Sequence, residues 1–240
     1  MAGHSKWNNI MHKKGANDAL RAKSFQKISK EISNAVKLGK SGKVEDNPSL
    51  RLVLEKARAE NMPKDVIERA INKALGAGED DNSVEVFYEG YGKDGVAFLV
   101  AALTDNKNRT ASEVRTAFNR NGGALGESGS VSYLFNRKGV LVFEKGSLSS
   151  EDFLEVSLTS EVLDTDENEE TYIVYTEADK LISTKESFIK EGISNFLVSE
   201  VGFVPDVYIK VEGDNHQKNI DLRNALDNLD DVLNVYDNME

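Results

Sequence analysis

Apolar residues recur at helical spacing through the first third of the chain. Between about residues 18 and 38 they fall every three or four positions, at Phe25, Ile28, Ile32, Ala35 and Val36, which is the spacing of one face of an α-helix. The same spacing returns in residues 49–61 and again after Pro63, and glycines at 76 and 78 end the last segment. The pattern predicts three helices that form an N-terminal helical domain over residues 1–77.

Beyond residue 78 the pattern changes to short strands that alternate with helices. Residues 84–88 alternate between apolar and polar, and residues 96–103 form a continuous apolar run, typical of a buried strand. Residues 110–121 return to helical spacing. Further strands are expected at residues 131–135, 140–143, 171–175, 196–203, 207–211 and 232–236, with helices at about 150–159, 177–190 and 216–228.

Residues 139–204 fit the order strand, helix, strand, strand, helix, strand. The fit requires a short strand near residues 161–163. This order is the plan of a ferredoxin-like domain.

The N-terminal end is basic, although the chain as a whole is acidic. Residues 1–43 contain ten lysines and arginines against two acids, a net charge of +8, whereas the whole chain carries −11 and residues 78–240 carry −19. Such a sign asymmetry indicates a polyanionic partner, either nucleic acid or an anionic membrane surface. A membrane is the less favoured of the two, because the apolar face of the first helix lacks a run of bulky side chains.

Lysines occupy the side of the first predicted helix that lies opposite its apolar face. They are Lys23, Lys27, Lys30 and Lys37. As a row of ammonium groups they would contact phosphates with little base selectivity. A solvated surface is the simpler interpretation of one basic helix, but the preceding segment adds to the case for nucleic acid. It contains Lys6, Lys13 and Lys14, together with Trp7, which could either stack on a base or anchor the segment to the core.

Arginines in the middle of the chain could extend this basic surface. Residues 105–145 carry a net charge of +3, in contrast to the acidic C-terminal half. Arg109 and Arg115 could contact phosphate, or could equally pair with Glu113 or Glu127. The sequence leaves both alternatives open.

Other residue types exclude several classes of protein. The chain has no cysteine, so a disulfide framework, a thiolate nucleophile and a cysteine metal site are excluded. The glycines of residues 121–130 are not followed by the Lys-Ser/Thr pair of a phosphate-binding loop, which favours a helix cap and a tight turn. His216 is the only histidine outside the N-terminal segment, so a Ser-His catalytic pair lacks candidates. We expect no enzyme, cofactor, metal or small-molecule substrate, no membrane span or secretory signal, and a cytoplasmic location.

Long motifs in the chain resemble the YebC/PmpR family. They are GHSKWNNI at Gly3–Ile10, NMPKDVIERAINKALG at Asn61–Gly76, NRTASEVRTAF at Asn108–Phe118 and NGGALGESGSVSYLF at Asn121–Phe135. The resemblance extends over essentially the whole chain, with departures at Met11 and Gly15. It implies nucleic-acid binding in gene expression: members are described as DNA-binding transcriptional regulators, a mitochondrial relative is a translational activator, and some bacterial relatives associate with ribosomes.

The family architecture also implies how the domains are connected. We expect an α+β protein in which the N-terminal three-helix domain is followed by two α/β domains. One of them, residues 137–204, is ferredoxin-like and is inserted in the other, which comprises residues 78–136 and 205–240.

These observations lead to one functional prediction with two alternatives. We predict a nucleic-acid-binding regulator of gene expression, in the first place a DNA-binding transcriptional regulator. A translation factor that binds the ribosome or ribosomal RNA is the alternative, and a protein-interaction module without nucleic acid is the third. The predicted binding residues are Lys6, Trp7, Lys13, Lys14, Lys23, Lys27, Lys30, Lys37, Arg109 and Arg115.

Overall fold

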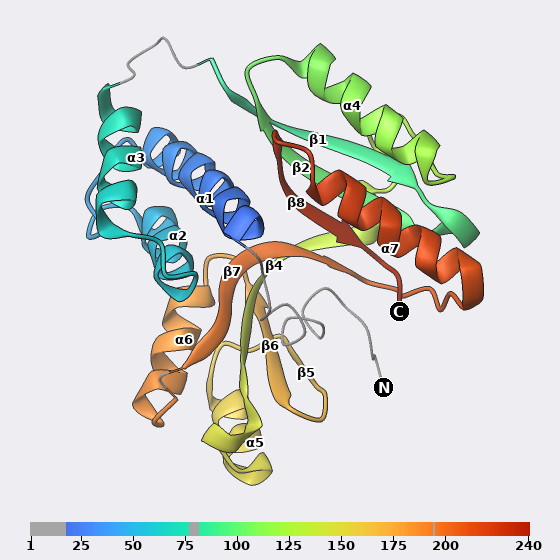
Figure 1. Ribbon diagram of the computed structural model, residues 1–240. Coiled ribbons are helices and arrows are strands. Elements are labelled where there is room, and N and C mark those ends of the chain that lie inside the picture. Colours follow the sequence, from blue (N-terminus) through green and yellow to red (C-terminus); the bar gives the residue numbers. More distant parts are fainter. Residues whose placement is uncertain (1–17, 77–81, 194) are drawn as a thin grey trace. The chain divides into compact units, whose positions relative to one another are not determined.

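The computed structural model describes residues 18–76, 82–193 and 195–240 (Figure 1). The described chain forms two compact units. Of the described residues, the larger unit contains 18–76, 82–135 and 205–240, and the smaller contains 136–193 and 195–204.

Three helices begin the larger unit, as the apolar spacing predicts. They are α1 (Asp18–Gly39), α2 (Pro48–Ala59) and α3 (Lys64–Gly76). Ile28 and Ile32 of α1 are buried against Leu50 and Leu54 of α2, and Ala70 of α3 completes this small core. Burial of these side chains stabilises the helices more than their intrinsic propensity does.

Asn47 fixes the junction between α1 and α2. Its side chain is buried and caps α2 by accepting a hydrogen bond from Leu50 N at 3.0 Å. Its amide nitrogen donates to Ala35 O and Ser41 O, both at 2.9 Å. One side chain therefore satisfies the start of α2, a carbonyl group in the last turns of α1 and a carbonyl group in the segment between the two helices.

A four-stranded sheet forms the rest of the larger unit. Its strands are β1 (Val84–Tyr91), β2 (Ala97–Thr104), β3 (Ala124–Leu125) and β8 (Val232–Asp237), in the order β3-β1-β2-β8. β1 and β8 both pair antiparallel with β2, which is buried along its whole length. Two helices, α4 (Lys107–Arg120) and α7 (Gly213–Asp227), pack on the same face of β2 through Phe118 and Leu222, which meet Phe98 in one core.

The smaller unit has the ferredoxin-like order that the sequence predicts. Its elements are β4 (Phe135–Glu144), α5 (Ser150–Thr159), β5 (Asp164–Glu167), β6 (Thr171–Glu177), α6 (Leu181–Lys190) and β7 (Phe196–Pro205). The sheet order is β5-β6-β4-β7. Both helices cover one face, because the ring of Phe143 lies 6.0 Å from that of Phe153 in α5 and 5.5 Å from that of Phe188 in α6.

The chain leaves and re-enters the larger unit at neighbouring points. Asp206 N donates a hydrogen bond to Leu134 O at 3.0 Å, immediately before β4 begins and after β7 ends. The α+β class and the ferredoxin-like unit are therefore confirmed. The individual boundaries of the three predicted domains stay a prediction.

Three predicted strands differ from the structure. Residues 132–134 form a 3₁₀ turn instead of a strand, because the backbone N–H groups of Val131 and Ser132 donate to the Glu89 carboxylate and not to a neighbouring strand. In residues 207–211 the only strand-like pairing among the described residues is a single bridge between Ile209 and Met239. The short strand expected at residues 161–163 lies at Asp164–Glu167, three residues later.

Candidate nucleic-acid interface

The lysine face of α1 lies against an acidic turn between α7 and β8. This turn has the sequence DNLDD at residues 227–231. Lys23 Nζ donates to the carbonyl oxygen and the side chain of Asn228, and Lys27 Nζ forms an ion pair of 2.7 Å with Asp227. The Lys27 side chain is only 15% exposed. We expected this face to be open to solvent, but it is partly covered by contacts within the same unit.

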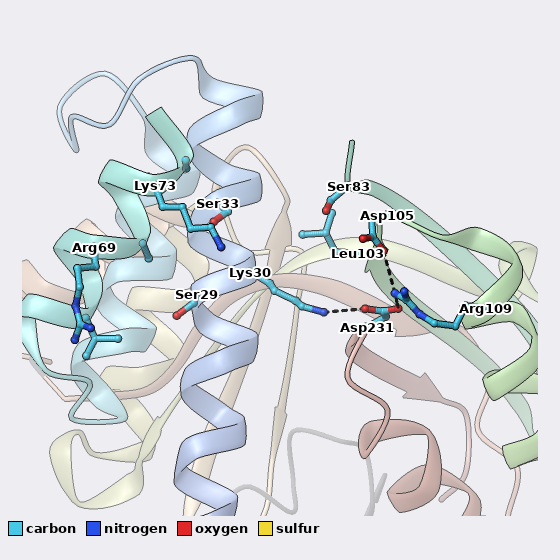
Figure 2. Close-up of a pocket in the computed structure, with 13 residues that line it drawn as sticks. Ser29, Lys30, Ser33, Arg69, Lys73, Ser83, Leu103, Asp105, Arg109 and Asp231 are labelled. Atoms are coloured by element: carbon cyan, nitrogen blue, oxygen red, sulfur yellow. Dashed lines mark hydrogen bonds and ion pairs between the residues drawn. The ribbon is translucent and has the colours of Figure 1, made fainter. Parts of the chain in front are cut away.

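Lys30 extends the same contact to Asp231. Its Nζ donates to Asp230 O at 2.7 Å and to Asp231 Oδ1 at 2.9 Å (Figure 2). Asp231 is 7% exposed and begins the approach to β8. Burying a carboxylate is costly unless it is paired and hydrogen-bonded, and the other oxygen of Asp231 also has partners.

Asp231 joins the end of β2 to the start of α4. Its Oδ2 accepts hydrogen bonds from Arg109 Nη2 at 2.7 Å, from Thr110 Oγ1 at 2.8 Å and from Thr104 Oγ1 at 3.1 Å. Arg109 Nη2 also donates to Asp105 Oδ1 at 2.9 Å. One buried carboxylate thus connects α1, β2, α4 and the turn before β8.

The titration of these groups follows from their contacts. Burial by itself would raise the pKa of Asp231, but hydrogen bonds from Arg109, Lys30 and Thr110 outweigh burial and hold this pKa well below its ordinary value. Burial lowers the pKa of Lys27, and its ion pair with Asp227 opposes the change. Asp231 is therefore ionised throughout the physiological range, and its charge organises the two cations beside it.

A pocket opens beside Asp231, between the helices of the N-terminal region and the sheet. Its volume is about 530 Å³. The polar and charged lining residues are Ser29, Lys30, Ser33, Arg69, Lys73, Ser83, Asp105, Arg109 and Asp231. Figure 2 shows the Lys73 side chain extending from α3 towards Ser33 of α1, while Lys30 and Arg109 approach Asp231 from opposite sides.

Several cations of α1–α3 and of the segment between α1 and α2 have no ion pair with any described residue. They are Lys40, Lys43, Arg51, Arg58, Lys64 and Lys73. Lys56 differs, because it pairs with Glu31 at 2.8 Å. Sequence reasoning assigned no role to Lys73, because it used α3 only for its apolar spacing. The sequence does place Lys73 next to the apolar residues Ala70 and Ala74 on α3, and this spacing could have indicated that it faces the rest of the protein.

The predicted binding residues fall into three groups. Lys6, Trp7, Lys13 and Lys14 lie outside the described residues. Lys23, Lys27, Lys30 and Arg109 are brought together around the 227–231 turn. Lys37 lies in the last turn of α1, and Arg115 is exposed on α4 without an ion pair to a described residue. Arg109 pairs with Asp105 and Asp231, not with the Glu113 or Glu127 considered from the sequence.

The glycine-rich loop after α4 is filled by a carboxylate of the protein itself. Glu89 is buried and accepts hydrogen bonds from Gly129 N at 2.8 Å and from Val131 N and Ser132 N at 2.7 Å. Burial would raise the pKa of Glu89, but the backbone N–H groups outweigh it and lower that pKa. These N–H groups are therefore used internally, which agrees with the interpretation of the loop as a structural turn.

Two further properties are evident in the part of the chain that the structure describes. None of the helices there is both long enough and apolar enough to cross a membrane. Histidine and acidic side chains do not gather there in groups of three or more with metal-binding geometry.

Comparison with known proteins gives matches over nearly the whole chain. Residues 5–77 match the family described as TACO1/YebC protein N-terminal domain, and residues 83–239 match TACO1/YebC second and third domain. The chain is 47% identical over 242 residues to a probable transcriptional regulatory protein of Geobacillus sp. (strain WCH70), covering 100% of this chain and 98% of the relative. It is 46% identical to one of Listeria innocua, covering 100% of this chain and 99% of the relative.

A solved structure agrees with these sequence matches. The crystal structure of a conserved hypothetical protein from Aquifex aeolicus superimposes with a TM-score of 0.88 at 43% identity, covering 98% of this chain and 97% of that chain. Because the family matches, the full-length relatives and this structure agree, the chain belongs to the TACO1/YebC family.

Proposed function

We propose that this protein is a nucleic-acid-binding regulator of gene expression, and that its first target is DNA. The observation that carries the proposal is the separation of charge along the chain. Residues 1–43 carry +8, whereas residues 78–240 carry −19. A basic region of this kind attracts a polyanion, while the acidic remainder repels it, so that the protein binds through one end.

The names of the relatives support the same role. Proteins from Geobacillus and Listeria that match along their full length are named probable transcriptional regulatory proteins. These names describe regulators and not enzymes, which is why we propose a binding role without a catalytic step.

The contacts of α1 favour binding to the backbone of the nucleic acid. Its lysine face is engaged by the 227–231 turn, so α1 in this arrangement does not present a free face for insertion into a major groove. The cations that form no ion pair within the described chain, such as Lys40, Lys43 and Lys64, are mostly lysines, which act on phosphate as point charges. Specificity would then come from shape, and sequence would contribute little.

The same observation favours ribosomal RNA as a second candidate target. Structured RNA is recognised largely by its shape and by backbone contacts, because its deep major groove is inaccessible to side chains. A protein that contacts phosphates without a free base-reading helix could therefore act on the ribosome. The alternative function is a ribosome-associated translation factor.

The decisive experiment compares the two targets with the full-length protein. Affinity for a labelled duplex DNA is measured across salt concentrations, and cosedimentation with ribosomes is measured with and without nuclease. If about six phosphates are neutralised on duplex DNA, log K falls with log salt with a slope near −5. An affinity that is independent of salt between about 50 and 200 mM would refute electrostatic binding. Cosedimentation that nuclease abolishes, together with weak duplex binding, would favour the ribosomal alternative.

A further inference from the structure

The pocket beside Asp231 contains many hydrogen-bond donors that no described residue uses. Both hydrogen bonds of Arg109 to acids start from Nη2, which leaves Nη1 and Nε without partners in the described chain. Lys30 uses its ammonium group on Asp230 O and Asp231, and an ammonium has a third hydrogen. Lys73 has no ion pair with a described residue. Three cations therefore offer donors to this space.

Three of the four carboxylate oxygens in the pocket lining, in contrast, are occupied. Asp231 Oδ1 accepts from Lys30, and its Oδ2 accepts from Arg109, Thr104 and Thr110. Asp105 has one oxygen engaged by Arg109. The lining residues contain four cations and two carboxylates, and the carboxylate in the centre is saturated. A site whose free cationic donors outnumber its free carboxylate oxygens favours an anion.

One wall of the pocket is apolar. Val66, Ala70 and Ala74 lie four residues apart along α3, so they form a stripe on one side of this helix. Leu103 of β2 also lines the pocket. Small side chains leave room for a flat group, such as a sugar or a base, next to the charged groups.

We propose that this pocket binds one strand of nucleic acid. Phosphates of the strand contact the ammonium group of Lys73 on α3 and the free N–H groups of Lys30 and Arg109, while a sugar or base lies on the α3 stripe. The inference rests on the proposed function and adds to it a site and a class of ligand, a single-stranded phosphodiester. Asp231 positions Lys30 and Arg109 and does not itself contact the strand.

The size of the pocket decides between one strand and two. A volume of about 530 Å³ lies within the range of pockets that hold small ligands, roughly 300–1,000 Å³. A few linked nucleotides can enter such a space, whereas a duplex is far wider and would touch only its rim. The strand can be RNA or DNA, because both have the same phosphodiester.

The test compares two lysines on opposite sides of α3. Lys73 lines the pocket, and Lys64 lies nine residues earlier, about 180° around the helix. Both are exposed and unpaired with described residues, and each becomes alanine, which a helix tolerates best. The full-length variants Lys73→Ala and Lys64→Ala lose the same charge from the same helix, so a difference between them reports on the pocket.

Affinities of wild type and both variants are measured for a short single-stranded RNA, the corresponding single-stranded DNA and the duplex. We expect Lys73→Ala to weaken single-strand binding by about tenfold, as for the loss of one charged contact. For this variant, the slope of log K against log salt should become shallower by about one. Lys64→Ala should bind within about twofold of wild type, since only long-range attraction is lost.

Three outcomes would overturn the inference. Equal losses of single-strand affinity in the two variants would mean that the strand binds outside this pocket, and would leave the proposed function intact. An equally large effect of Lys73→Ala on the duplex would contradict the preference for one strand. The absence of any nucleic-acid binding by wild type would refute the proposed function together with the site. Adenosine monophosphate serves as the free-nucleotide competitor, and displacement of the strand only at a large excess is the result expected of a strand site.

Discussion

Replacement of Asp231 by asparagine tests the network that joins α1 to the sheet. Asparagine has nearly the same shape but carries no charge, and one of its two polar atoms is a donor. Two oxygens of Asp231 accept four hydrogen bonds, so the amide group of asparagine must face at least one donor. The substitution therefore removes two ion pairs and creates a donor–donor conflict in a buried place.

The size of the expected loss of stability follows from how exposed the paired side chains are. Removal of one partner from a buried ion pair costs about 3–5 kcal/mol. The Asp231 side chain is 10% exposed, but Lys30 and Arg109 are 33% and 46% exposed and regain some hydration. We therefore expect the free energy of unfolding to fall by about 2–4 kcal/mol. In a chain of this size, the melting temperature would fall by about 4–16 °C.

Circular dichroism during heating and urea denaturation measures this loss, with Asp230→Asn as the matched control. Asp230 is the neighbouring residue in the same turn and is exposed, and among the described residues only its carbonyl oxygen is engaged, as an acceptor from Lys30. A surface substitution of this kind changes stability by about 0.5 kcal/mol or less. If Asp231→Asn has the same melting temperature as Asp230→Asn, the network does not stabilise the fold as we describe.

The pH dependence gives an independent check. The pKa of Asp231 is lower in the folded protein than in the unfolded chain, where it is about 3.9. The stabilisation by its charge is therefore complete above the unfolded pKa and is lost as pH falls through the folded pKa. The difference between wild type and Asp231→Asn should be constant above about pH 5 and should narrow below about pH 4. A difference that persists unchanged in acid would mean that the charge is not its cause.

Three further predictions concern other parts of the chain. Glu89→Gln should lower the free energy of unfolding by about 1–3 kcal/mol, because a buried N–H loses its acceptor, and should speed hydrogen exchange at Gly129 N. Glu85→Gln, in an exposed side chain of β1, should do neither. Asn47→Ala should lower the free energy of unfolding in urea by about 2 kcal/mol through loss of a cap, one buried and one partly buried hydrogen bond; a change within error would refute its role at the junction. Trp7→Ala should leave the melting temperature unchanged and weaken binding to single strands by about 5- to 150-fold, whereas a loss of about 3–5 kcal/mol in stability would show a core residue.

Local pattern was sufficient to predict most elements of the fold. The apolar spacing of Ile28 and Ile32 predicts α1, and the continuous run of β2 predicts a strand that is buried on both sides. The weak element was β5, whose four residues Asp164–Glu167 are polar and partly exposed. Short edge strands of this kind carry little hydrophobic signal, so the position of β5 was three residues in error.

The surroundings of the predicted site could not be read from the sequence. Lys27 and Lys30 pair with acids about two hundred positions later in the chain, and no periodicity reports a contact at that separation. Charge reversal of these lysines is therefore a poor test of binding, because it would also break the contact with the 227–231 turn. Lys73 was missed for a related reason, since the pocket that it lines exists only after α3 and β2 come together.

The neighbouring exit and entry points of the inserted unit restrict how these two segments of the chain can move. Leu134 and Asp206 are hydrogen-bonded at 3.0 Å, and the strands that continue from them, β4 and β7, are neighbours in one sheet. The two units are thus joined by a double-stranded ribbon and not by a single flexible segment. A ribbon can bend or twist, but rotation about one backbone bond in either strand is resisted by the other strand. The start of β4 and the end of β7 therefore behave as one piece of sheet and not as two independent linkers.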